Sequence, residues 1–166
     1  MRFAPAAVAL SLCLAMSASV LSAGSGAAPD PRAAALIAQG RAALEAGEAQ
    51  AAVDAFEAAL AVDPGHTPIF INLAEAARQQ GLQGKAIRYY REALERDPGN
   101  FAAIAGEGAA LVEKGAIEKA KRNLAKLQSL CGDACPETVA LQGSIARGPS
   151  ARLAADSVTD KGPASN

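Results

Sequence analysis

The stretch DPGHTPIFINLAEAARQQGLQGKAIRYYREALERDPGN, residues 63–100, opens with a tripeptide that returns 34 residues later. Three glycines and three alanines are spaced by the same interval: Gly47, Gly81 and Gly115, and Ala52, Ala86 and Ala120. A period in this range is typical of helical repeat arrays, in which each unit buries its apolar face by stacking on its neighbours. The spacing therefore predicts a repeat protein whose function is binding rather than catalysis.

Within each unit the apolar residues recur at helical spacing, and glycines or Asp-Pro-Gly triplets end the runs. Asp30-Pro31 and Thr67-Pro68 each place a capping residue before a proline that suits a first helical turn. Period-2 alternation and β-branched runs are missing, so no strand is predicted. We expect an all-α helix-turn-helix solenoid of three repeats and a capping helix. The predicted units are residues 33–66, 67–100, 101–134 and, for the capping helix, 135–147.

The two ends of the chain differ in composition from the repeats. Residues 1–23 hold one charge, Arg2, then an apolar stretch and small residues, which is the pattern of a cleaved export signal. The stretch is short for a membrane span and no basic stop-transfer cluster follows, which disfavours an uncleaved anchor. Residues 24–32 are predicted to be a linker and 148–166 a disordered tail. We expect a periplasmic or secreted protein with no membrane span in its mature chain.

The charge of the chain disfavours two classes of partner. The sequence has 16 Lys and Arg against 17 Asp and Glu, a formal net charge of −1, without a lysine- or arginine-rich run. The electrostatic footprint of a nucleic-acid-binding protein is therefore absent. No basic amphipathic segment suggests attachment to a membrane surface.

The repeats resemble the tetratricopeptide repeat family over residues 33–134. Its signature is an aromatic, Leu-Gly, a second aromatic, a central Ala, a second-helix aromatic and a closing Pro. Gln39 and Glu107 depart from the signature leucine, and the third unit has no closing proline. The matching residues are Leu36, Gly40, Ala43, Ala52, Phe56 and Pro64; Phe70, Leu73, Ala74, Ala77, Ala86, Tyr90 and Pro98; and Ile104, Gly108, Leu111, Ala120 and Leu124.

The resemblance implies a binding surface. In this family the first helix of each unit lines a concave groove that takes up a peptide or a helix of a partner protein. Some members of the family clamp a carboxylate with conserved polar residues, of which only Asn72 matches here, so we expect the clamp to be absent. The alternative to a binding groove is an inner face that is simply solvated. The residues at groove positions are Ile37, Arg41, Leu44, Glu45, Ile71, Asn72, Glu75, Arg78, Gln79, Ala105, Ala109, Val112 and Glu113.

Two cysteines, Cys131 and Cys135, lie where the third repeat meets the capping helix. An oxidising compartment favours a disulfide that ties this turn, and its small ring predicts a gain of about 2 kcal/mol. A thiol-redox pair, a soft-metal site and unpaired thiols are the alternatives. The spacing is one residue longer than Cys-x-x-Cys, and zinc needs about four ligands while the only histidine, His66, is distant in sequence. No metal or cofactor is predicted.

We therefore predict a non-enzymatic exported adaptor or scaffold that holds a segment of another protein in its groove. The acidic residues of the first unit have no nucleophile or base partner beside them, so no catalytic residue is assigned. The alternative function is a periplasmic thiol-redox or metal-handling accessory that uses Cys131 and Cys135. A third hypothesis is self-association through the small apolar outer face of the first unit, around Ala33, Ala34 and Ala38.

Overall fold

The computed structural model describes residues 28–149, and within this range every regular element is a helix. The all-α prediction is confirmed. The predicted signal peptide, residues 24–27 of the linker and residues 150–166 of the tail lie outside the described residues. The helices are α1 (Pro31–Glu45), α2 (Ala49–Val62), α3 (Pro68–Gln79), α4 (Gln83–Arg96), α5 (Phe101–Glu113), α6 (Ile117–Cys131) and α7 (Pro136–Arg147).

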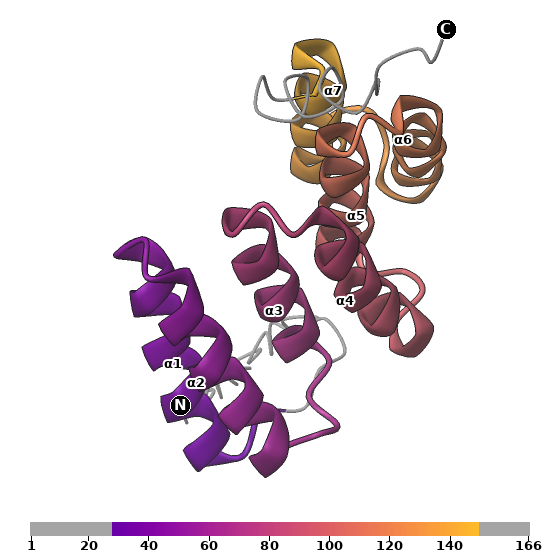
Figure 1. Ribbon diagram of the computed structural model, residues 1–166. Helices are drawn as coiled ribbons and strands as arrows, with labels where there is room; N and C mark the ends of the chain where they lie inside the picture. The colour runs from indigo at the N-terminus through magenta and orange to yellow at the C-terminus, as the bar shows by residue number, and fades with distance from the viewer. Residues whose placement is uncertain (1–27, 150–166) are drawn as a thin grey trace, which may run out of the picture.

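The helices stack in chain order as a solenoid of hairpins (Figure 1). The pairs α1–α2, α3–α4 and α5–α6 correspond in order to the three predicted units. The second helix of one pair packs against the first helix of the next, so that α2 contacts α3 and α4 contacts α5. Helix α7 packs on both α5 and α6 and covers the end of the array. None of the helices within residues 28–149 combines the length and hydropathy that a membrane crossing requires.

The first helix begins inside the segment assigned to the linker. The Asp30 carboxylate accepts a hydrogen bond of 2.8 Å from the Arg32 backbone N–H, and Pro31 occupies the first helical turn. This cap accepts a hydrogen bond from a backbone N–H that has no acceptor within the helix. Pro31 has no N–H, so it leaves no donor unsatisfied in the first turn. The linker prediction is therefore corrected, because Pro31 and Arg32 belong to α1.

The repeated glycines end the first helix of each pair. Gly47, Gly81 and Gly115 have φ values of 78°, 73° and 79°, a left-handed conformation that side chains disfavour. After Gly47, the Glu48 N–H donates to the Ala43 carbonyl at 2.8 Å, which closes the C-terminal turn of α1. Each glycine therefore reverses the chain into the second helix, which explains the period seen in the sequence.

Close helix approaches in the core follow the small residues. A Cβ atom at Gly40 would overlap the ring of Phe56, as the resemblance implies for the first unit. The third unit differs, because the side chain that occupies the space beside Gly108 is Leu141 from α7. Tyr90 lies against Gly106 of the following helix pair. The capping helix thus fills a space that a second-helix aromatic fills in the first unit.

Candidate partner-binding groove

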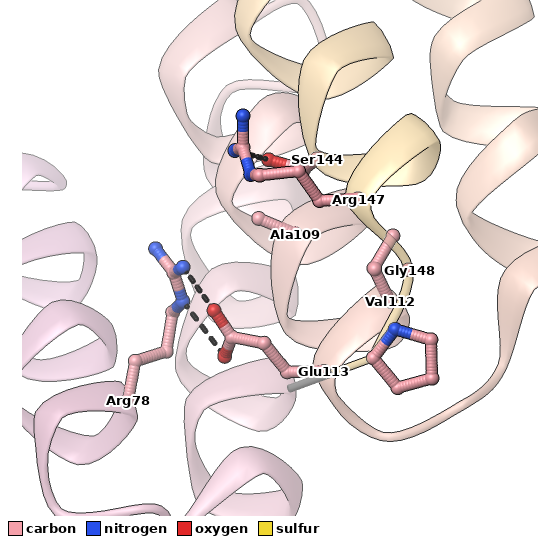
Figure 2. A pocket seen from close by; sticks show the side chains of 8 residues that line it. Arg78, Ala109, Val112, Glu113, Ser144, Arg147 and Gly148 are labelled. Atoms are coloured by element: carbon pink, nitrogen blue, oxygen red, sulfur yellow. Dashed lines mark hydrogen bonds and ion pairs between the residues drawn. The ribbon is translucent and has the colours of Figure 1, made fainter. Parts of the chain in front are cut away.

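A cavity of about 400 Å³ opens where α3, α5 and α7 meet (Figure 2). We call it the groove cavity. Its volume lies within the range of typical ligand sites, about 300–1,000 Å³. Among the residues that line the cavity, only those on α3 and α5 were predicted from the sequence to lie in the groove. The lining consists of Arg78, Ala109, Val112, Glu113, Ser144, Arg147, Gly148 and Pro149.

An ion pair joins α3 to α5 at one side of this cavity. The Arg78 guanidinium donates to both carboxylate oxygens of Glu113, including a bond of 3.2 Å from Nε to Oε2 (Figure 2). Its third nitrogen, Nη1, donates to Glu75 Oε2 at 2.9 Å, and the Tyr90 hydroxyl donates to the same oxygen at 3.0 Å. The bidentate geometry orients the guanidinium, so Arg78 and Glu113 form a fixed wall of the cavity.

Burial and the two carboxylates act in opposite directions on Arg78. Burial disfavours the charged guanidinium, but the hydrogen bond that it donates to Glu113 and the charge of Glu75 outweigh burial and raise the pKa of Arg78 above its ordinary value. Burial, followed by the charge of Glu75, raises the pKa of the Tyr90 hydroxyl. Arg78 therefore stays charged and Tyr90 stays a neutral donor, and the network is already satisfied before any partner arrives.

Arg147 is the cation at this cavity that is left without a carboxylate. Its Nη2 donates to the Ser144 hydroxyl at 3.2 Å, and within residues 28–149 it makes no ion pair. The groove positions were predicted from the three repeats alone, so Arg147 on α7 was not among them. Glu45, Gln79 and Glu113 recur at the 34-residue interval, and Arg147 is the next member of that series. Extending the period into α7 would have found it.

The other predicted groove residues are distributed along the array. Ile37 is 5% exposed, packs in the apolar cluster that α1 forms with α2 and α3, and does not line the groove cavity, so its place in the groove stays a prediction. Val112 is 2% exposed but lines the groove cavity, as do Arg78 and Ala109. The Gln79 side chain approaches the Leu44 carbonyl at 3.5 Å and links α3 to α1.

Eight of the remaining predicted positions do not line the groove cavity. Within the described part of the chain, Asn72 Nδ2 is buried and has no hydrogen-bond partner. Glu75 takes part in the Arg78 network, and the others are exposed or half-buried on α1, α3 and α5. The positions are Arg41, Leu44, Glu45, Ile71, Asn72, Gln79 and Ala105, with Glu75 beside the cavity.

The cysteine turn connects α6 to α7, the helix that carries Ser144 and Arg147. Cys131 ends α6 and Cys135 precedes Pro136, with Gly132 at a φ of 87° between them. Their Cα atoms are 5.7 Å apart and the sulfur atoms are paired in the structure, a separation that suits a disulfide. The oxidation state in the cell stays a prediction. Among residues 28–149, no three His, Cys, Asp or Glu side chains gather to hold a metal ion.

Comparison with known proteins supports the repeat assignment. The tetratricopeptide repeat family model matches residues 37–101. The structure is similar to the Sgt2 TPR domain from Aspergillus fumigatus, with a TM-score of 0.64 and 23% identity over 84% of this chain and 89% of that one. No curated protein sequence gives a significant match.

Two further solved structures contain bound peptides. The first TPR domain of Spaghetti (RPAP3), bound to the HSP90 peptide SRMEEVD, has a TM-score of 0.63 and 20% identity over 70% of this chain and 91% of that one. The Yersinia enterocolitica type III secretion chaperone SycD, in complex with a peptide of the translocator YopD, has a TM-score of 0.60 and 20% identity over 77% and 94%.

Together the helix order and the stacking define an all-α helical repeat solenoid. Residues 37–101 of this solenoid match the tetratricopeptide repeat model, and the described chain has the fold of TPR domains. These two findings support the resemblance seen in the sequence.

Proposed function

We propose that this protein is a non-enzymatic adaptor that binds a segment of a partner protein in the groove cavity. The observation that carries the proposal is the cavity itself, with an apolar floor at Ala109 and Val112 and, beside it, the guanidinium of Arg147, which makes no ion pair within residues 28–149. Tetratricopeptide arrays use such inner surfaces for binding, and two structures with this fold contain bound peptides.

The lining indicates the chemistry of the bound segment. Ala109 and Val112 offer a small apolar surface, which suits one aliphatic side chain of the partner. Arg147 offers a charged donor for a carboxylate on the same segment, and Ser144 lies next to it. Arg78 is less suited to this role because its guanidinium is already paired with Glu75 and Glu113. The partner segment is therefore expected to combine an aliphatic and an acidic side chain a few residues apart.

Export of the protein is part of the same proposal. It rests on the sequence of residues 1–23, where one arginine precedes an apolar stretch and small residues. Amino-terminal sequencing of the protein isolated from its native cells tests it. A first residue near position 24 supports periplasmic or secreted location, and an intact Met1 contradicts cleavage.

Photo-crosslinking inside the cavity tests the groove assignment. A photoreactive amino acid replaces Ala109 in the native organism, and the captured proteins are identified by mass spectrometry. We expect one or two partners whose yield falls strongly when Arg147→Glu is added, because the reversed charge repels the partner's carboxylate. Arg122→Glu, an exposed charge reversal on α6, is the matched control and should leave the yield unchanged. Equal yield in the two variants contradicts the assignment.

A further inference from the structure

A second cavity, of about 210 Å³, lies between α4, the end of α5 and the first turn of α6. It shares no lining residue with the groove cavity. We call it the basic pocket. Ile87 and Leu111 form its apolar part and are almost completely buried. Four of the eight lining residues are cationic and none is acidic; the cations are Arg88, Arg91, Lys114 and Lys119.

Only one of the four cations is neutralised within residues 28–149. Arg91 Nε lies 2.7 Å from Glu107 Oε1, and Asn123 holds the other oxygen of that carboxylate at 3.0 Å. The remaining three cations form no ion pair in the described part of the chain; they are Arg88, Lys114 and Lys119. Like charges around one cavity repel each other, so an anion between them lowers the free energy of the cluster.

The positive charge of the basic pocket depends on which residues occupy its positions and is not a property of the repeat fold itself. The positions on α2 that match Arg88 and Arg91, 34 residues earlier, hold Asp54 and Glu57. The same outward helix face is thus acidic in the first repeat and basic in the second. Because the fold is common to both repeats, the basic pocket is a local feature that a partner can distinguish.

Glycine at position 84 opens the pocket. The corresponding positions of the first and third repeats hold Gln50 and Glu118, whereas a Cβ at Gly84 would meet only Lys114 Nζ, at 4.0 Å. A glutamate here, as in the third repeat, would bring a carboxylate to the lysine. Its absence leaves the lysine free to bind an external anion.

The size and the charge of the pocket restrict its occupant. A volume of about 210 Å³ is below the range of small-molecule sites and accommodates one or two side chains. We propose that the basic pocket binds an acidic segment of a partner protein, with carboxylates paired to Arg88, Lys114 and Lys119. The basic pocket shares no lining residue with the groove cavity, so the proposal for one site can be contradicted without affecting the proposal for the other.

Nuclear magnetic resonance of the isotope-labelled protein tests the proposal with a blocked hexaglutamate peptide, and hexaglutamine is the uncharged control. We expect saturable shifts of the backbone amide signals of Gly84, Lys114, Ala116 and Lys119 with hexaglutamate only. Arg88→Gln combined with Lys114→Gln should raise the peptide's Kd about fivefold, since it removes two exposed ion pairs. Arg122→Gln, which lies at the matching position of the third repeat, should leave it unchanged.

Three results would overturn the proposal. The first is a set of shifts spread evenly over the basic residues of the surface. The second is an equal response to inorganic phosphate, which would assign the pocket to a free oxyanion. The third is a dimer in sedimentation velocity that dissociates in Asp54→Asn combined with Glu57→Gln, which would assign the pocket to a second copy of this chain.

Discussion

At the scale of single residues, the network of Arg78, Glu75, Glu113 and Tyr90 explains how the groove cavity is held open. Each nitrogen of the Arg78 guanidinium donates to a carboxylate oxygen, and its ion pair joins two residues that are 35 positions apart in sequence. Arg147, in contrast, makes no ion pair within residues 28–149 and is the candidate to bind a partner. The two arginines therefore have different roles, one in the wall of the cavity and one in recognition.

The hydroxyl of Tyr90 should make stability depend on pH in the alkaline range. Because the fold raises the pKa of Tyr90, its contribution is fully present below about pH 10, the value of an unfolded tyrosine, and is lost as pH rises above it. Tyr90→Phe removes the hydrogen bond to Glu75 and should cost about 1 kcal/mol at pH 7. Urea unfolding from pH 7 to 11 measures the difference between the two proteins. It should shrink at high pH, and a constant difference contradicts the argument.

At the residue scale, a residue's role could be predicted from the sequence where that role depends on its own backbone conformation. Gly47, Gly81 and Gly115 were predicted as helix ends because the left-handed backbone needs them, and their φ values agree. Sequence reasoning did not foresee the burial of Ile37, because the burial of a first-helix position depends on which helices surround it. The repeat period alone does not supply that information.

At the scale of elements, α7 is more than a cap. Leu141 packs in the space beside Gly108, and Ser144 and Arg147 line the groove cavity. The sequence indicated a capping helix, and Arg147 continues the 34-residue series of groove positions, but that series alone does not show how α7 packs against the groove. Only the packing of α7 on α5 brings Arg147 to Ala109 and Val112.

The cysteine turn should control how firmly α7 is held. Replacing both cysteines by serine should lower the free energy of unfolding by about 2 kcal/mol, because the ring they close is small. It should also weaken partner binding, since α7 carries Arg147. Urea unfolding measures the loss of stability, and isothermal titration calorimetry with the partner segment measures the loss of binding. Thiol titration of the unfolded wild-type protein checks that the disulfide is present.

Thiol titration also distinguishes the proposed adaptor from a redox or metal-handling protein. A structural disulfide leaves no titratable thiol at Cys131 and Cys135 and resists mild reductants. Two free thiols in the protein as isolated, or one copper ion bound per reduced pair, would contradict the structural role and favour the alternative function.

At the scale of the whole molecule, the fold separates two surfaces with different chemistry. The groove cavity lies between α3, α5 and α7, and the basic pocket lies between α4, α5 and α6. The 34-residue period was sufficient to predict the solenoid, because the repeating glycines and alanines determine helix ends and close packing. Four lining residues of the groove cavity were predicted as groove positions, but the cavities themselves were not, because each is built by residues from three helices.

The central claim is that a partner segment binds at Arg147 in the groove cavity. Once crosslinking has identified the segment, isothermal titration calorimetry of its synthetic peptide against the wild type and Arg147→Glu tests the claim most directly. We predict a Kd at least tenfold higher for the variant, a loss of about 1.4 kcal/mol, with Arg122→Glu unchanged. Equal affinity of the wild type and Arg147→Glu would show that the segment binds elsewhere and would contradict the account.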